Sequence, residues 1–168
     1  LDKVNLKMEA GERLAIVGPS GSGKSTILRL LAGLILPTGG KLDLFGEEQS
    51  FLRLDQSKPP DVRLVFQNPA LLGSLTVEEN VGFILRRNSN FKEERIKTLV
   101  DKSLEEVGLF DVADKFPGQL SGGMQKRVSF ARALINETNN SNQAMPLLLY
   151  DEPTAGLDPV ASTRIENL

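Results

Sequence analysis

Apolar and polar residues alternate at the start of the chain and then gather into short runs. The alternation over residues 4–8 and the apolar run RLAIVG (13–18) predict two short strands around a turn. The segment STILRLLAGLIL (25–36) repeats its apolar positions at helical spacing, so we predict a helix there. KLDLFG (41–46) and VRLVFQ (62–67) are typical of further strands.

The second half of the chain has a helical period until its last apolar run. We predict helices over 76–87, where Thr and Glu form a capping box, over 92–109, and after the Ser-Gly-Gly turn at 121–123. PLLLYDEP (146–153) predicts a final strand. Strands alternating with helices favour an α/β fold with a mostly parallel sheet, and the helical stretch 70–136 predicts an inserted subdomain.

Composition narrows the classes of protein. The 168 residues suit one domain. A net charge of -2 gives no excess of positive charge to bind nucleic acid, so we predict no nucleic-acid partner. Cys and His are both absent from the sequence, which excludes a disulfide framework. The apolar run Leu28–Leu36 is too short for a spanning helix. Leu1 begins inside an alternating pattern, so the sequence resembles an excerpt.

The segment GPSGSGKS (18–25) fits G-x-x-x-x-G-K-[ST] between a predicted strand and a predicted helix. Such glycines let successive backbone amides point at phosphate oxygens, at the positive end of the helix. We expect Lys24 to reach the β- and γ-phosphates of ATP and Ser25 to bind Mg²⁺. The alternative is a plain glycine-rich turn. The expected ATP-binding residues are Gly18, Pro19, Ser20, Gly21, Ser22, Gly23, Lys24, Ser25 and Thr26.

Two adjacent carboxylates follow the last predicted strand. The carboxyl end of a strand is where ligands bind in doubly wound sheets. We expect Asp151 to hold Mg²⁺, mainly through water, and Glu152 to orient or deprotonate an attacking water. The alternative is a pair of solvated turn residues.

Four motifs in order resemble the nucleotide-binding domain of the ATP-binding cassette (ABC) family: the glycine loop, LSGG (120–123), DEP (151–153) and AGLD (155–158). The resemblance implies one nucleotide-binding domain, residues 1–168, truncated at both ends. It has a P-loop NTPase-type parallel sheet core (1–69 and 137–168), a small antiparallel β part and a helical subdomain (70–136).

The resemblance also implies a role for the Ser-Gly-Gly turn. Ser121, Gly122 and Gly123 would touch the γ-phosphate of an ATP bound by a second copy of the domain, in a head-to-tail homodimer. A hydroxyl and free amides at a helix start form an anion site on physical grounds alone. A simple helix cap is the alternative.

Two further positions are assigned by the resemblance. Gln67 resembles the glutamine that approaches Mg²⁺ and the attacking water, so the implied catalytic set is Glu152, Gln67 and Lys24, and the metal set is Ser25, Gln67 and Asp151. Asp158 resembles an aspartate at the dimer interface, near the partner's ATP. Gln67 as an ordinary residue after a strand, and Asp158 as a turn residue, are the alternatives.

Three departures from the family pattern accompany these matches. No aromatic residue precedes Phe45 to stack on adenine, and no histidine is present to contact the γ-phosphate. Met124 stands where many members have Gln. We therefore expect the natural protein to extend in both directions and this stretch alone to hydrolyse ATP poorly.

The residues within and around these motifs favour one subfamily. LSGGMQKRVSFARAL (120–134) and LLLYDEPTAGLDPVAST (147–163) resemble the ATPases of Mla/Mce-type phospholipid transporters, and most those of the chloroplast trigalactosyldiacylglycerol transporter. This implies an ATP hydrolase on the stromal or bacterial cytoplasmic side of a membrane, with permease subunits and an Mce-type lipid-binding subunit. Alternatives are the ATPase of another solute transporter, a soluble cassette of translation or DNA repair, and a module that binds ATP without cleaving it.

Overall fold

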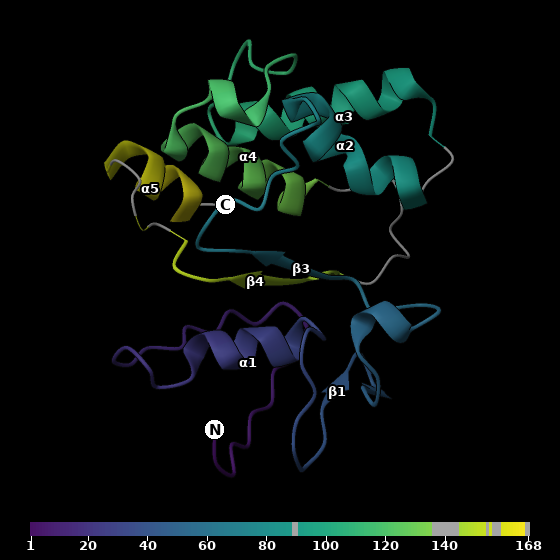
Figure 1. The fold of residues 1–168 in the computed structure, drawn as a ribbon, viewed down its shortest axis with the longest axis vertical. Coiled ribbons are helices and arrows are strands. Elements are labelled where there is room, and N and C mark those ends of the chain that lie inside the picture. Colours follow the sequence, from purple (N-terminus) through teal and green to yellow (C-terminus); the bar gives the residue numbers. More distant parts are fainter. Residues whose placement is uncertain (89–90, 136–144, 154, 156–158, 167–168) are drawn as a thin grey trace. The chain divides into compact units, whose positions relative to one another are not determined.

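The chain folds into two compact units, neither of which is continuous in sequence. Unit 1 comprises residues 1–64 and 143–151, and unit 2 comprises residues 65–142 and 152–168. The computed structural model describes residues 1–88, 91–135, 145–153, 155 and 159–166. Its helices and strands are drawn in Figure 1.

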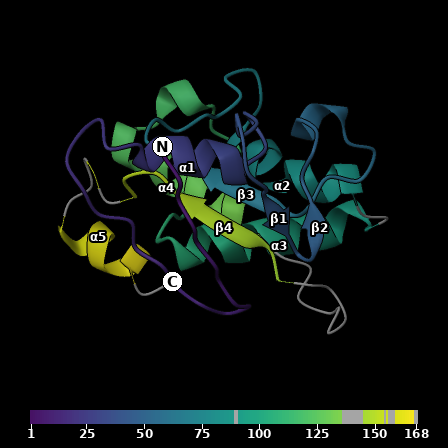
Figure 2. The same ribbon diagram turned by 90° about the horizontal axis from the view of Figure 1, so that it is seen from below.

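Unit 1 contains one α-helix, a short hairpin and a second pair of strands. Figures 1 and 2 show β3 and β4 side by side, and they form a two-stranded sheet. In the antiparallel hairpin, β1 and β2 are joined through Phe45 and Gly46, whose φ angles of 54° and 83° are typical of a primed turn. The elements are α1 (Lys24–Leu31), β1 (Asp43–Leu44), β2 (Glu47–Glu48), the 3-10 turn Arg53–Asp55, β3 (Val62–Val65) and β4 (Leu147–Tyr150).

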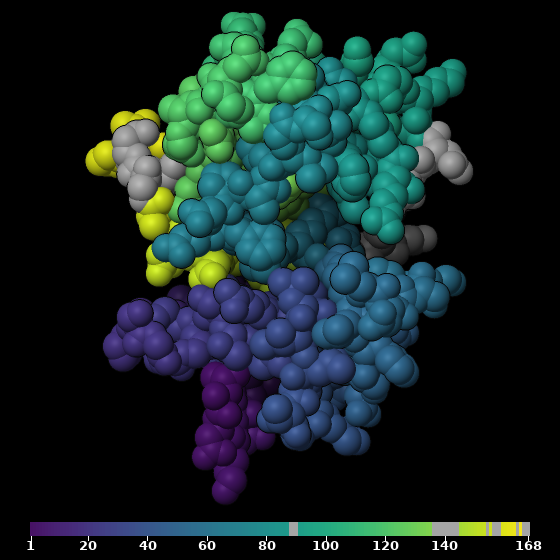
Figure 3. Space-filling model, in the orientation of Figure 1, coloured from purple at the N-terminus to yellow at the C-terminus, as the bar shows by residue number. Residues whose placement is uncertain are grey.

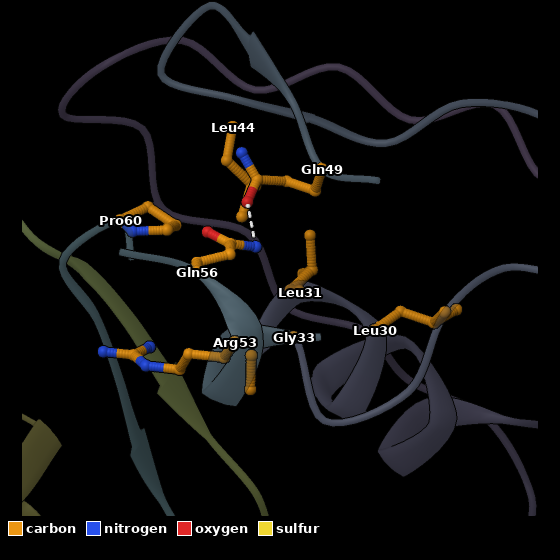
Figure 4. Close-up of a pocket in the computed structure, with 9 residues that line it drawn as sticks. Leu30, Leu31, Gly33, Leu44, Gln49, Arg53, Gln56 and Pro60 are labelled. Carbon is orange, nitrogen blue, oxygen red and sulfur yellow. Dashed lines mark hydrogen bonds between the residues drawn. The ribbon is translucent and has the colours of Figure 1, made fainter. Parts of the chain in front are cut away.

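Apolar side chains from α1 and three strands form the core of unit 1. Ala32, Leu44, Val62 and Leu149 are buried there. The partly buried residues packed against them are Leu28, Leu31, Leu42, Leu64 and Leu147. Beside this core is a small depression lined by Leu30, Gly33, Arg53 and their neighbours, in which Gln56 donates a hydrogen bond to Gln49 (Figure 4). None of the residues expected to bind ATP lines this depression.

Helix α1 ends earlier than its apolar period predicts. The sequence predicts a helix to residue 36, but Gly33 has a φ of 67°. The Gly33 amide donates to the Leu30 carbonyl and the Leu34 amide to the Arg29 carbonyl, both at 2.9 Å. This pair of bonds is a Schellman motif, which ends a helix by satisfying its last carbonyls.

The strands predicted within residues 1–17 are not present, and that prediction is wrong. These residues are all exposed, and Val17 is 92% exposed. Figure 3 shows this segment in purple. A strand is stable when a neighbour satisfies its backbone groups. In the described part of the chain the strand pairs are β1 with β2 and β3 with β4, so residues 1–17 have no ladder to join.

Unit 2 is built on three helices that pack against one another (Figure 1). Their buried faces carry residues such as Val81, Val100 and Phe130, which are at most 1% exposed. The predicted capping box is confirmed, because the Glu79 amide donates to Thr76 Oγ1 and the Thr76 amide donates to Glu79 Oε2. The elements are α2 (Val77–Asn88), α3 (Glu93–Glu106), the 3-10 turn Pro117–Gln119, α4 (Gly122–Leu134) and α5 (Pro159–Glu166).

A fully buried asparagine fastens the loop that precedes α2. Asn80 Oδ1 accepts from the Leu72 amide at 2.8 Å. Its Nδ2 donates to the carbonyls of Leu72, Leu75 and Thr76 at 2.9–3.1 Å. Since a buried amide without partners is costly, this set of bonds defines the course of the loop.

Candidate functional site

The glycine loop of unit 1 leads directly into the first turn of α1. Gly21 and Gly23 have φ angles of 80° and 96°, a region that glycine enters without the steric cost other residues meet. Gly23 is the N-cap of α1, and its carbonyl accepts from the Ile27 amide at 3.0 Å. The loop residues Gly18, Pro19, Ser20, Gly21 and Ser22 are exposed, and Thr26 is partly buried in α1. The loop thus combines positive-φ glycines with a helix start.

Lys24, the first residue of α1, folds back over the beginning of this loop. Its Nζ donates to the carbonyls of Gly18 and Pro19 at 2.8 and 2.9 Å. The ammonium group therefore lies beside the same backbone segment whose amides are expected to bind phosphate. A cation in this place favours a negatively charged ligand.

A hydroxyl and a carboxylate meet at the end of β4. Ser25 Oγ donates to Asp151 Oδ1 at 3.1 Å, although the two residues are 126 positions apart. Both are oxygen ligands of the kind that Mg²⁺ prefers. Water usually fills the remaining positions of the Mg²⁺ coordination shell. The donor set therefore fits Mg²⁺.

Glu152 directly follows Asp151 in the sequence and belongs to unit 2. Its backbone has a φ of 50°, in the left-handed region that is uncommon for a residue with a side chain. The exposed carboxylate accepts a hydrogen bond from Gln67 Nε2 at 2.7 Å. Gln67, two residues after β3, and Glu152 are thus brought together from positions 85 residues apart.

Lys126, on α4, is a residue that the sequence interpretation missed. Its side chain is buried, and its Nζ donates to the carbonyls of Glu152 at 2.8 Å and Ala155 at 2.6 Å. Burial lowers the pKa of this ammonium group, and the charge of Glu152 acts in the opposite direction. The signal was available in the helical spacing, because Lys126 precedes the apolar Phe130 and Ala133 by four and seven positions on one face.

A second side chain of α4 also holds a loop. Arg132 Nη1 donates to the Ala70 carbonyl at 2.7 Å, three residues beyond Gln67. Burial lowers the pKa of this guanidinium. Helix α4 therefore contacts the backbone after Gln67 and the backbone at Glu152 within the same unit.

Ser121 caps the start of α4. Its Oγ accepts from the Met124 amide at 3.3 Å, and its side chain is exposed. Gly122 is also exposed, with no atom within 4 Å of the place a Cβ would take, and Gly123 is half-buried. The cap uses the hydroxyl oxygen as an acceptor, so its proton can still be donated to a ligand. Asp158, the remaining predicted site residue, lies outside the described residues.

A glycine loop opening a helix, with a carboxylate from a neighbouring strand beside the first helical hydroxyl, defines the P-loop NTPase class, and the sheet core is of that parallel type. The chain belongs to the ABC transporter family, whose sequence pattern matches residues 1–155.

Curated relatives extend over nearly all of the chain. It is 47% identical over its full length to the protein TRIGALACTOSYLDIACYLGLYCEROL 3, chloroplastic, of Arabidopsis thaliana, covering 49% of that protein. Identity is 43% to a spermidine/putrescine import ATP-binding protein of Nitrosomonas europaea and 44% to a sulfate/thiosulfate import ATP-binding protein of Bradyrhizobium diazoefficiens. Each of these two matches spans 94% of the chain, and 41% and 44% of the relative. The chain thus spans about half the length of the curated relatives it matches.

A solved structure supports the same assignment. The ATP-binding cassette MJ0796, a dimer in a post-hydrolysis state with ADP and Pi, matches with a TM-score of 0.83 and 33% identity. The match covers 98% of this chain and 70% of that one. Among the described helices, none has the length and low charge needed to cross a lipid bilayer.

Proposed function

We propose that this chain binds ATP with Mg²⁺ and hydrolyses it as part of the ATPase subunit of a membrane transporter. The contact of Ser25 Oγ with Asp151 Oδ1, beside a loop of positive-φ glycines, is the observation that carries the proposal. The loop amides and Lys24 bind the phosphates, and Ser25 and Asp151 would hold the metal. The bound metal would neutralise charge on the phosphate oxygens during transfer.

Glu152 acts as the general base for the attacking water. Its carboxylate is exposed and is oriented by the Gln67 amide, whose Nε2 donates to it at 2.7 Å. A carboxylate held in one direction accepts a proton from water as the oxygen attacks the γ-phosphorus. The remaining catalysis is positioning and charge stabilisation, as in other phosphoryl transfers.

A second copy of the chain completes each ATP site. Ser121, Gly122 and Gly123 are exposed or half-buried at the start of α4, as a group that binds the partner's γ-phosphate needs to be. Asp158 would lie at the same interface. The dimeric form of the matched cassette supports a homodimer. In this proposal residues 1–69 and 137–168 form the ATPase core, and residues 70–136 form the helical subdomain that meets the permease.

The substrate we propose is a phospholipid or another lipid. The support is the 47% identity to the chloroplast relative over the full length of the chain. The subunit would be peripheral, on the stromal or bacterial cytoplasmic side, with a permease and an Mce-type lipid-binding subunit. The import ATPases for spermidine/putrescine and for sulfate/thiosulfate, 43% and 44% identical, support a different solute as the alternative.

Reconstitution separates the two substrates. The full-length protein, purified with its associated subunits, is placed in vesicles, and ATP-dependent transfer of a fluorescent phospholipid is measured beside uptake of spermidine and sulfate. We expect lipid transfer that stops in the Glu152→Gln variant. Solute uptake without lipid transfer would show that the substrate is that solute and not a lipid. Absence of Mg²⁺-dependent ATP hydrolysis would overturn the proposed ATPase activity itself.

A further inference from the structure

We propose that Lys126 is a positioning residue for Glu152: from α4 it fixes the backbone that carries the catalytic carboxylate. The inference rests on the proposed function, because it assigns a role within the same hydrolytic site. Lys126 does not touch the reacting atoms in this assignment. It acts through the main-chain carbonyls of Glu152 and Ala155.

The contacts of the ammonium group are backbone contacts at both ends of one turn. Nζ donates to the carbonyls of Glu152 and Ala155 at 2.8 and 2.6 Å, and the Ala155 amide donates back to the Glu152 carbonyl at 3.3 Å. The Lys126 residue is 4% exposed. In the part of the chain that the structure describes, this ammonium forms no salt bridge, so the two carbonyls, together with the more distant charge of Glu152, compensate for its burial.

The turn that Lys126 holds contains a strained residue. Glu152 has a φ of 50°, and a residue with a Cβ persists in that region when surrounding contacts define it. A hydrogen bond to its carbonyl opposes rotation of the peptide group that follows Glu152. Without that bond the chain could relax toward a common conformation, and the carboxylate would turn with it.

Glu152 is therefore held at two points by two different residues. Gln67 Nε2 contacts the carboxylate at 2.7 Å, and Lys126 Nζ contacts the main-chain carbonyl at 2.8 Å. Holding only the side chain leaves the backbone free to shift, and holding only the backbone leaves the side-chain torsions free. A displacement of about 1 Å at a catalytic group can cost on the order of 100-fold in rate.

The test compares Lys126→Met, which keeps the length and removes the donor, with Lys126→Arg and with Val128→Ala. Val128 is fully buried on α4 and lies two positions from Lys126, so it faces a different side of the helix, and its truncation weakens the helix packing. The full-length protein with its subunits is assayed for kcat, for KM for ATP and for Tm. We expect Lys126→Met to lower kcat about 10- to 100-fold with KM for ATP little changed. Lys126→Arg should recover part of kcat, and Val128→Ala should lower Tm while keeping kcat.

The outcomes separate this inference from the proposed function. If the wild-type complex hydrolyses ATP and Lys126→Met does so at the same kcat, only the positioning role fails. It also fails if Val128→Ala lowers kcat as much as Lys126→Met does. A wild-type complex without ATP turnover overturns the proposed function instead. Should Lys126→Met not fold, Lys126→Leu takes its place: its apolar side chain also lacks a donor, and a wild-type kcat would again overturn the role.

Discussion

The glycine loop and the Glu152 turn reach unusual backbone conformations by opposite means. In the loop, positive φ angles fall on glycines, and Lys24 contacts carbonyls only five and six residues away. At Glu152, a positive φ falls on a residue with a side chain, and its partners Gln67 and Lys126 are 85 and 26 positions away. The conformation of the phosphate-binding loop is thus determined by residues close in sequence, whereas the placement of the carboxylate depends on the tertiary structure.

The largest effect expected is on the chemistry at Glu152. Glu152→Gln removes the proton acceptor but keeps the shape, so we expect kcat to fall about 100- to 10,000-fold with ATP affinity retained. Titration of the full-length variant with a fluorescent ATP analogue, beside its steady-state rate, measures both. With ATP the variant should sediment as a closed dimer. A variant that stays monomeric would contradict the two-copy site.

A smaller effect is expected at the glycine loop, where the change is in ATP affinity. Lys24→Ala removes a charge-assisted contact to phosphate worth about 1.5–3 kcal/mol, so ATP affinity should fall about 10- to 100-fold. Isothermal titration of the full-length protein gives the affinity directly. Lys102→Ala is the matched control, since its side chain is 61% exposed and 4.0 Å from Glu106. Equal affinities in Lys24→Ala and the control would remove Lys24 from the phosphate site.

The smallest effects expected are on stability, and they have opposite signs in the two regions. Gly21→Ala puts a Cβ at a φ of 80° where no atom lies within 4 Å, so only backbone strain of about 1–2 kcal/mol should destabilise the fold. Glu152→Gly should relieve strain and stabilise by about 0.5–1 kcal/mol while removing the carboxylate. Denaturant unfolding without nucleotide compares them. Destabilisation by Glu152→Gly would mean that its side-chain contact outweighs the strain.

The same division explains what the sequence could predict. The capping box at Thr76 and Glu79, the extent of α2 and the start of α4 follow from residues close in sequence, and they were predicted well. The helix predicted to residue 36 failed because its apolar period continues past Gly33, where the backbone turns. The predicted strands within residues 1–17 failed because a strand depends on pairing with another segment, which no local pattern supplies.

The candidate site shows the same limit. The sequence placed a glycine loop before a helix and a carboxylate after a strand, since both are local features. Lys126 was missed because a lysine in a helix is usually interpreted as a solvent-exposed charge. Only its helical spacing from apolar residues indicates that it lies on the buried face. Its acceptors are backbone carbonyls, which carry no side-chain signal in a sequence.

The discontinuity of unit 1 has a consequence for how the chain emerges from the ribosome. Ser25 and its partner Asp151 are 126 positions apart, and β4 is made after α2, α3 and α4. At about 5–20 residues per second, roughly 6–25 s of translation separate the two groups. The helices of unit 2 can pack during that interval, while unit 1 still lacks a strand. The meeting of hydroxyl and carboxylate therefore follows the synthesis of these three helices, and it completes unit 1.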